Sequence, residues 1–560
     1  MSIFTPSEKD TSPLPVTMFG PDFPFAYDEW LDHPAGLGTL PQAVLGREVA
    51  IIGAGLSGMV AAYELMNLGL KPVIYEPTRI GGRLRTHRFD GAEGVVAELG
   101  GMRFPTSGST FFHYADLLGL DHRPFPNPLT PAAGSTVIDI GGETFYGQTL
   151  ADLPETFTRI SDAWDAALEE IGYTEMQEAI RHRDVPRLKR SWDTLVAEWD
   201  DRTFYDFIAR SKAFGSLSFR DRELFGVVGF GTGGWDSDFP NSMLEILRVV
   251  LTNCDADQRL IVGGVDQLPR GLWELPVRPG GPWPSGTTLS SLHHGATLAA
   301  ASAIGKDDDG RFCVRDRWGT TRRHHAVVAT CHSWLLTTEV DCDEGLFSQD
   351  LWMALDRTRY MQSTKTFVMV DEPFWLRTDP ETGRQQMSMT LTDRLTRGTY
   401  LFDDGPDRPA AICLSYSWMS DSLKMLPHAV DRRVDLALNS LSKIYPTVDI
   451  RGHIVGEPVT VSWEDDPFFL GAFKGALPGH YRYNYRMYTH FMQQGLPESQ
   501  RGIFLAGDDV SFTPAWAEGA VQTGLNAVWG VMDYFGGSCA GDNPGPGDLF
   551  DEIAPVALAD

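Results

Sequence analysis

The hydrophobic pattern near the N-terminus switches from strand to helix and back to strand. Residues 48–53 (EVAIIG) are a short apolar run of the kind that forms a buried strand. Residues 56–69 carry apolar side chains at helical spacing, and Gly69 is a typical residue at the end of a helix. Residues 71–76 (KPVIYE) are a second apolar run. This order predicts a β-α-β unit, the repeating element of a parallel sheet.

The pattern changes further along the chain. Residues 155–250 show charged and apolar faces at helical spacing and predict a mostly helical region. Short runs typical of strands return over residues 260–340, and strands mix with helices over residues 355–500. Residues 501–509 (RGIFLAGDD) predict one more strand before a final helical stretch. The start, middle and end of the chain therefore predict parts of one discontinuous domain.

The composition is typical of an ordered protein with two or three domains. Of the 560 residues, 42% are apolar and 22% are charged, which disfavours a disordered chain. No apolar run approaches the ~18 residues that a membrane-spanning helix needs. The N-terminus has neither the basic nor the apolar region of a signal peptide. We therefore expect a cytoplasmic protein that does not associate with membranes.

The net charge of −28 narrows the range of partners. An acidic surface repels nucleic acid and anionic lipid, so we expect neither as a partner. The same charge mildly favours a cationic substrate, although solubility alone explains it. The six cysteines include no C-x-x-C pair, and the adjacent pairs His293-His294 and His324-His325 would point to opposite faces of a strand. We therefore expect no metal site.

A glycine motif lies at the turn between the first predicted strand and helix. Gly53, Gly55 and Gly58 form a G-x-G-x-x-G pattern, and Glu76 ends the second strand. In this context the first glycine allows the tight turn, the second lets backbone amides approach a pyrophosphate, and the third lets helix and strand pack closely. The Glu76 carboxylate can accept hydrogen bonds from a ribose. A glycine-rich turn without a ligand is the alternative interpretation.

Further blocks follow in a fixed order along the chain. Residues 79–85 (RIGGRLR) place glycines beside arginines that can bind anionic oxygens. Residues 98–105 (ELGGMRFP) come next, and the later blocks are GGVDQLPRGL, LAGD and PAWAEGA, at residues 263–272, 505–508 and 514–520. Together these blocks resemble the flavin amine oxidase superfamily over residues 49–527. Within it the sequence is most similar to bacterial amino acid 2-monooxygenases and oxidases, including the L-lysine oxidase/monooxygenase group.

The resemblance implies a mixed α/β fold with a discontinuous Rossmann-like FAD-binding domain, a mixed-sheet substrate domain and a helical domain. It also implies that FAD is bound without a covalent tether, because residues 513–524 contain no cysteine where covalent members have one. The expected segments are an N-terminal arm (1–45), the FAD-binding domain (46–104, 255–345 and 500–540), the substrate domain (105–150 and 346–499), the helical domain (151–254) and a C-terminal tail (541–560).

The resemblance assigns the cofactor contacts residue by residue. In the family, the matching residues lie along the pyrophosphate, the ribose, the ribityl chain and the flavin ring of FAD. The helix that begins near Glu518 would direct its N-terminus at the pyrimidine edge of the flavin, which favours the negative charge gained on reduction. The implied cofactor-binding residues are Gly53, Gly55, Gly58, Glu76, Gly82, Arg83, Gly101, Met102, Arg103, Gly507, Asp508, Trp516 and Ala517.

Four residues resemble those at the family's reaction centre. Arg103 and Tyr416 correspond to the pair that binds the substrate α-carboxylate, a group that guanidinium matches in a two-pronged geometry. Lys365 corresponds to a lysine that holds a water near flavin N5, and Trp516 to an aromatic residue facing the flavin. The alternatives are a structural ion pair for Arg103, an ordinary sheet tyrosine for Tyr416 and a surface position for Lys365.

The walls of the substrate pocket are less well defined by the sequence. Trp418 and Phe473 are candidates for two walls, although aromatic residues are usually core. Asp238, between Trp235 and Phe239, is a candidate counter-charge for a cationic side chain, with a turn or helix-cap residue as the alternative. Cys254 could line the same wall, with a structural cysteine as the alternative.

The expected activity is oxidation of an L-amino acid at its α-carbon, with hydride transfer to the flavin and reoxidation by O2. The products are a 2-oxo acid, ammonia and peroxide, or an amide and CO2. The expected substrate is a basic amino acid, above all lysine. The protein is expected to be a homodimer. The alternatives are a phenylalanine or tryptophan 2-monooxygenase, an oxidase of amines without a carboxylate, and a non-catalytic FAD-binding protein.

Overall fold

A four-stranded parallel sheet brings together segments that are far apart in the sequence. In the computed structural model, which describes residues 3–4, 14–228 and 240–558, its strand order is β2-β1-β13-β22. Every neighbouring pair in it is parallel. The strands come from the start, middle and end of the chain, so the expected discontinuous Rossmann-like sheet is confirmed. Their bounds are β1 (Glu48–Ile52), β2 (Lys71–Tyr75), β13 (Ala326–Ala329) and β22 (Ile503–Leu505).

Both faces of this sheet are buried, as a continuous apolar strand requires. Val49 and Ile51 of β1 pack with the helices α2 (Leu56–Asn67) and α16 (Ala517–Tyr534) on one face. Ala50 and Ile52 face a second core on the other side, which includes strands of a small sheet. The order of the small sheet is β12-β11-β10-β14. Its strands are β10 (Ala301–Lys306), β11 (Phe312–Asp316), β12 (Thr321–His324) and β14 (Asp341–Cys342).

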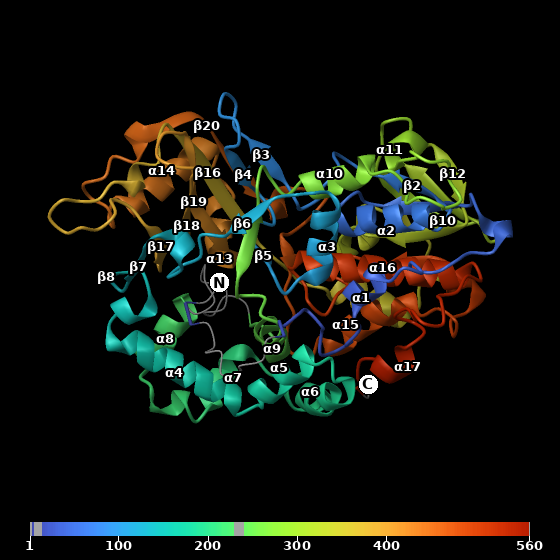
Figure 1. The fold of residues 1–560 in the computed structure, drawn as a ribbon, viewed down its shortest axis with the longest axis horizontal. Coiled ribbons are helices and arrows are strands. Elements are labelled where there is room, and N and C mark those ends of the chain that lie inside the picture. Colours follow the sequence, from blue (N-terminus) through green and yellow to red (C-terminus); the bar gives the residue numbers. More distant parts are fainter. Residues whose placement is uncertain (1–2, 5–13, 229–239, 559–560) are drawn as a thin grey trace.

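A seven-stranded mixed sheet forms the other large part of the molecule. Its order is β20-β16-β19-β18-β17-β7-β8, and the β17–β7 pair is parallel while the others are antiparallel. Figure 1 shows this sheet at one end of the long axis and the parallel sheet at the other. The strands are β7 (Thr136–Ile140), β8 (Glu143–Gly147), β16 (Ser363–Val370), β17 (Met389–Thr392), β18 (Gly398–Phe402), β19 (Ala410–Trp418) and β20 (Ile454–Ser462).

The helical region lies along one side of both sheets in Figure 1. A buried ion pair connects this region to the N-terminal segment, in which Arg248 contacts Asp22 at 2.6 Å. The Trp192 indole N–H donates to the same carboxylate, so this buried charge is fully paired. The helices are α4 (Glu155–Glu169), α5 (Tyr173–Arg181), α6 (Val185–Trp199), α7 (Phe204–Arg210), α8 (Phe219–Val228) and α9 (Met243–Leu251).

Short ribbons connect these parts. The strands β3 (Thr86–Arg88) and β4 (Val96–Glu98) pair with each other, as do β15 (Tyr360–Met361) and β21 (Phe473–Lys474). The strands β5 (Phe104–Pro105) and β6 (His122–Pro124) both pair with β9 (Gln258–Ile261). The remaining helices are α1 (Tyr27–Asp32), α3 (Ser109–Leu117), α10 (Gln267–Glu274), α11 (Leu289–Leu292), α12 (Gln349–Arg357), α13 (Met419–Met425), α14 (Val430–Leu441), α15 (Tyr481–Tyr488) and α17 (Phe550–Ile553).

The lengths of the apolar helices and the position of Asp238 both bear on function. No helix among them is both long and apolar enough to cross a membrane. Asp238, the proposed counter-charge of a cationic substrate, belongs to residues 229–239 and lies outside the described residues. Its role therefore stays a prediction.

Candidate active site

A cavity of about 490 Å³ extends from the parallel sheet to the seven-stranded sheet. One end follows the glycine motif and the end of β2, and the other lies between β19 and α9. The structure thus brings together residues that the sequence places hundreds of positions apart. The predicted site residues that line the cavity are Gly53, Gly55, Glu76, Gly82, Arg83, Gly101, Met102, Arg103, Lys365, Tyr416, Trp418, Phe473, Gly507, Asp508, Trp516 and Ala517.

The glycine motif has the close approaches that its pattern predicts. Gly53 has φ +109°, a conformation that favours glycine, and a Cβ there would lie 2.9 Å from the Thr330 hydroxyl oxygen. A Cβ on Gly58 would lie 2.1 Å from the Gly53 carbonyl oxygen. Gly58 therefore allows α2 to pack against β1. It does not line the cavity, unlike Gly53 and Gly55, so a direct cofactor contact for Gly58 stays a prediction.

The cavity fits a dinucleotide at this end. The helix α2 begins directly after Gly55, which lines the cavity, and no side chain caps its first turn. The N-terminus of a helix in this position favours an anionic group. The hydroxyl of Ser57 is buried, lines the cavity and has no hydrogen-bond partner. The Glu76 carboxylate accepts hydrogen bonds from Ala54 N at 2.9 Å and Thr78 N at 3.0 Å. These amides fix the carboxylate at the position where a ribose hydroxyl can donate to it.

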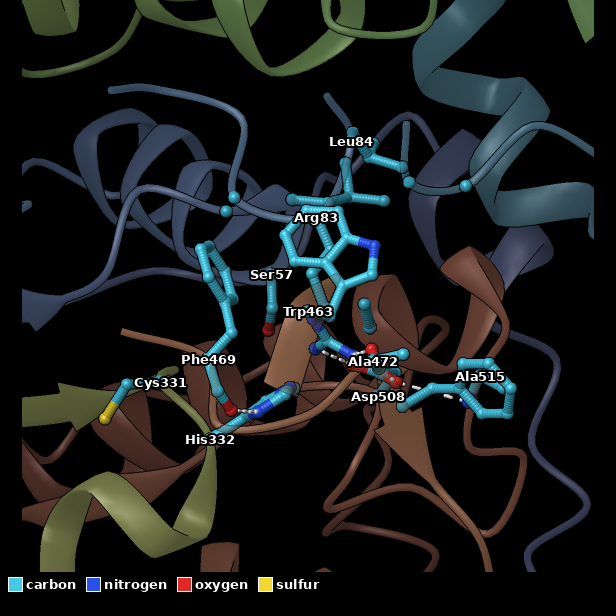
Figure 2. Close-up of a pocket in the computed structure, with 18 of the residues that line it drawn as sticks. Ser57, Arg83, Leu84, Cys331, His332, Trp463, Phe469, Ala472, Asp508 and Ala515 are labelled. Atoms are coloured by element: carbon cyan, nitrogen blue, oxygen red, sulfur yellow. Dashed lines mark hydrogen bonds and ion pairs between the residues drawn. The ribbon is translucent and has the colours of Figure 1, made fainter. Parts of the chain in front are cut away.

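Arg83 and Asp508 form one wall of the cavity (Figure 2). Arg83 donates to both carboxylate oxygens of Asp508 and, at 3.1 Å, to the Ala472 carbonyl. The Ala515 backbone N–H, just before α16, donates to Asp508 at 3.1 Å. Burial opposes the charge, but Arg83 lowers the pKa of the Asp508 carboxyl below its ordinary value. The pair therefore links three segments of the wall and stays ionised.

Lys365 lies beneath the backbone of residues 98–101. It is 3% exposed, and its ammonium donates to the carbonyls of Glu98 and Gly100. A Cβ on Gly100 would overlap the Arg83 carbonyl oxygen, so only glycine allows these two loops to meet. Burial lowers the pKa of Lys365 to about 7. Because an ammonium has three donors, one N–H remains to point into the cavity that Lys365 lines.

Arg103 is a half-buried cation that lines the cavity, and three aromatic rings lie close to its guanidinium. Its guanidinium lies 5.7 Å from the Tyr416 ring centroid and donates to the Tyr400 hydroxyl at 3.4 Å. Among the described residues, no carboxylate comes within 4.0 Å of it. A desolvated guanidinium without a counter-charge is costly, so the site favours an anionic ligand at this position. The structural ion pair considered as an alternative for Arg103 is therefore not present in the described part of the chain.

The register of the seven-stranded sheet places the other substrate residues. Lys365 on β16 is paired with Tyr416 on β19, and its ammonium lies 4.7 Å from the Tyr416 ring centroid. Trp418 stacks edge-on between Tyr416 and Phe473, with ring centroids 5.6 and 5.4 Å away. Trp516 is the residue directly before α16, and it also lines the cavity. These aromatic rings form an apolar surface beside the guanidinium of Arg103.

Cys254 lies outside the cavity wall. Its side chain is fully buried, lies 3.2 Å from the Thr252 hydroxyl and does not line the cavity. Burial raises the pKa of its thiol, so it remains neutral. A direct substrate contact for Cys254 stays a prediction, and the structure favours the alternative of a structural cysteine.

Sequence reasoning did not single out several residues of the cavity. Asp255, next to Cys254, and Glu245 on α9 add two carboxylates at the far end. Burial raises the pKa of Glu245 to about 7, and its carboxylate accepts a hydrogen bond from Ala476 N. The buried Trp463 lines the cavity and donates to the Leu99 carbonyl. No local motif marks these residues, since each reaches the cavity only through the tertiary fold.

The family is established by comparison with known proteins. A model described as "Flavin containing amine oxidoreductase" matches residues 56–532. The chain belongs to this family. FAD is accordingly its cofactor, and the cradle around Gly53, Gly55 and Ser57 fits it.

Relatives extend over nearly the whole chain. Tryptophan 2-monooxygenase of Pseudomonas savastanoi is 30% identical over 541 residues, which cover 91% of this chain and 93% of that protein. Tryptophan 2-monooxygenase of Pantoea agglomerans pv. gypsophilae is 28% identical, covering 93% and 94%. L-amino-acid oxidase of Mus musculus is 26% identical, covering 88% and 71%. The expected relationship to flavin amine oxidases and amino acid 2-monooxygenases is confirmed.

Solved structures support the fold. Cyclohexylamine oxidase from Brevibacterium oxydans IH-35A aligns with a TM-score of 0.62 at 16% identity, over 88% of this chain and 100% of that one. Putrescine oxidase, wild type bound to putrescine, aligns with a TM-score of 0.63 at 17% identity, over 87% and 99%. At this level of identity the similarity shows the fold alone.

We expect acid or heat to release intact FAD from the purified protein. Residues 513–524 contain no cysteine, and the cysteine that lines the described cavity, Cys331, lies beside Thr330 and Gly53 at the dinucleotide end. The check is chromatography and mass spectrometry of the supernatant after acid precipitation. Yellow flavin that remains in the protein pellet would reveal a covalent bond and contradict the prediction.

Proposed function

We propose that the protein oxidises a free L-α-amino acid at its α-carbon, as a 2-monooxygenase, an oxidase or both. One observation carries this proposal: Arg103 lines the cavity beside aromatic rings without a carboxylate partner among the described residues. A substrate α-carboxylate supplies the missing charge, and an amine without a carboxylate does not. The tryptophan 2-monooxygenases and the L-amino-acid oxidase among the relatives support the same substrate class.

Two groups of side chains orient the substrate, one at its α-carboxylate and one around its Cα–H bond. Arg103 and Tyr416 hold the α-carboxylate, and the Tyr400 hydroxyl holds the guanidinium. Trp418, Phe473 and Trp516 exclude water and fix the Cα–H bond toward the cofactor. Bound FAD supplies the chemistry, accepting a hydride and passing the electrons to O2. Because the α-hydrogen leaves as a hydride, no side chain has to act as a base toward it, and Lys365 can hold a water and a positive charge at the reaction centre.

Two product outcomes are compatible with this cavity. The imino acid either leaves and hydrolyses to a 2-oxo acid and ammonia, with H2O2 as the oxygen product, or it reacts with the peroxide formed from O2 and is converted to an amide, CO2 and water. A panel of amino acids tested aerobically, with peroxide and amide both quantified, distinguishes these outcomes. A panel in which no amino acid yields either product would contradict the proposed function.

We further propose that the preferred side chain is cationic, with lysine first. The supporting observation is that two carboxylates, Asp255 and Glu245, line the cavity, and Asp255 also interacts electrostatically with Arg103. Carboxylates in a partly buried cavity are costly unless a cation meets them. The alternative is an aromatic substrate, which the tryptophan 2-monooxygenases among the relatives favour. The same panel of amino acids distinguishes the two proposed substrates. A preference for tryptophan or phenylalanine over lysine would contradict the cationic proposal.

We expect Asp255→Asn to lower kcat/KM for lysine by about 2 kcal/mol, which is the low end of the cost of breaking a charge pair. The loss for phenylalanine should be smaller, because that side chain carries no charge. Asp257→Asn is the matched control, since Asp257 is exposed, pairs with Arg259 and does not line the cavity. An equal loss for both substrates would remove Asp255 from side-chain recognition.

A further inference from the structure

A second cavity of about 680 Å³ lies on the other side of residues 79–85. Gly82 and Leu84 of this segment line the cofactor cavity, while Arg79 and Arg85 line the second one. Leu99 lines both. The segment that follows the cofactor carboxylate Glu76 is therefore a wall between two cavities. Arg85, which the sequence suggested as a further ligand of cofactor oxygens, faces away from the cofactor cavity.

The second cavity gathers positive charge. Four arginines line it, against two carboxylates, and burial lowers the pKa of the one histidine, which favours its neutral form. The residues concerned are Arg79, Arg85, His87, Arg88 and Arg270, with Asp266 and Glu274.

The carboxylates do not balance the cations. Arg88 and Arg270 both donate to Asp266, at 2.8 and 3.4 Å, so one carboxylate is shared by two arginines. Glu274 is exposed, where solvent screens its charge. On a chain with a net charge of −28, such a local excess of cations is not explained by the general surface charge.

Among the described residues, no carboxylate lies within 4.0 Å of the Arg79 or Arg85 guanidinium, although Asp266 and Glu76 interact electrostatically with Arg79 over a longer distance. The Arg79 guanidinium donates to backbone carbonyls, with Gly82 O at 2.7 Å as the shortest contact. Within the described parts of the chain, the Arg85 side chain forms no hydrogen bond or ion pair. Both residues are half-buried, and burial lowers the pKa of Arg79, with the nearby Arg85 lowering it further. Two neighbouring guanidiniums that repel each other are stabilised by an anion between them.

We propose that this second cavity binds a phosphate-bearing small molecule, with Arg79 and Arg85 as the receptors of the phosphate. The planar fork of a guanidinium matches phosphate oxygens in pairs, and two forks match a dianion. The cavity is larger than a phosphate, and Ile80, Val459 and the buried Trp273 give it an apolar wall for an organic group. The site is separate from the amino acid site and from the pyrophosphate cradle.

The test uses the FAD-saturated protein, because the cofactor then occupies the pyrophosphate cradle. Inorganic phosphate and phenyl phosphate are titrated calorimetrically at constant ionic strength, with chloride as the balancing anion. We expect saturable binding of both to the wild type, with phenyl phosphate tighter because of the apolar wall. Saturable binding of phosphate alone assigns the site to the free ion and overturns the organic part of the proposal. No saturable binding of either overturns the whole proposal without any variant.

Variants place the binding at this cavity. We expect Arg85→Gln to weaken phosphate binding at least ten-fold. The control Arg210→Gln removes an equal charge from an exposed residue that pairs with Asp206, and binding should be unchanged. Arg85→Lys keeps the charge but lacks the planar guanidinium. It serves as the second variant if Arg85→Gln does not yield a flavin-loaded protein. Equal binding to these variants, the control and the wild type would overturn the assignment.

Discussion

Replacing Arg103 with alanine is expected to lower kcat/KM for the preferred amino acid by about 2–5 kcal/mol, or roughly 30- to 5,000-fold. The reason is that the variant leaves the substrate α-carboxylate in a partly desolvated, aromatic cavity with no counter-charge. Arg103→Lys should recover only part of the loss, since an ammonium cannot make the two-pronged contact. FAD should remain bound, because Arg83 and Asp508 hold the wall beside it. Steady-state kinetics and the flavin spectrum measure both effects.

The matched control for Arg103 is a change in the substrate. The amine that lacks the α-carboxylate of the preferred amino acid makes no use of the guanidinium. Its already low turnover should therefore change little in Arg103→Ala. Unchanged kinetics for the amino acid would exclude Arg103 from the substrate site. An equal loss for the amine would mean that the substitution disturbs the cavity as a whole.

Replacing Lys365 with methionine is expected to slow reoxidation of the reduced protein by O2 on the order of 10²-fold, while reduction by substrate changes much less. The Lys365 ammonium carries a positive charge at the reaction centre, and Lys365 is only 3% exposed. Stopped-flow absorbance resolves the two half-reactions. Lys474→Met is the matched control, because Lys474 is equally buried and donates to the Asp509 carbonyl but does not line the cavity. Unaltered reoxidation in Lys365→Met would refute the role.

The pH dependence follows from the lowered pKa of Lys365, about 7. The ammonium is present below this pH, so reoxidation of the wild type should be fastest at low pH and should fall as the pH rises through about 7. Burial also raises the pKa of the neighbouring Glu98 to about 7. The Lys365→Met variant separates the two groups, because its profile should be flat. A break that persists in the variant would assign the titration to a carboxyl with a similar pKa, Glu98 or Glu245.

The cofactor end of the site could be predicted because its determinants are local. Gly53, Gly55 and Glu76 act through a turn, a helix start and a strand end that lie within one β-α-β unit. The backbone conformation at Gly53 and the packing at Gly58 follow directly from the absence of a Cβ. The mixed α/β fold was predictable for the same reason, since the apolar runs and the helical spacing are visible along the chain.

The substrate end could be predicted only in part. Arg103, Lys365 and Tyr416 were found through their resemblance to a family, whereas the contact between Lys365 and Tyr416 depends on the register between β16 and β19. Asp255 and Glu245 reach the cavity from α9 and the loop after it, and a carboxylate on a helix carries no local sign of burial. The sequence also did not show that Arg85 lines a second cavity, because the pattern of a short loop does not determine which cavity a side chain faces.

The most direct test of the central claim is anaerobic mixing of the FAD-loaded protein with single amino acids and with the corresponding amines. Loss of flavin absorbance near 450 nm reports hydride transfer from the substrate. We expect at least one L-α-amino acid to bleach the flavin rapidly and its decarboxylated amine to do so far more slowly. Bleaching by the amine at the same rate, or no bleaching by any L-amino acid, would contradict it.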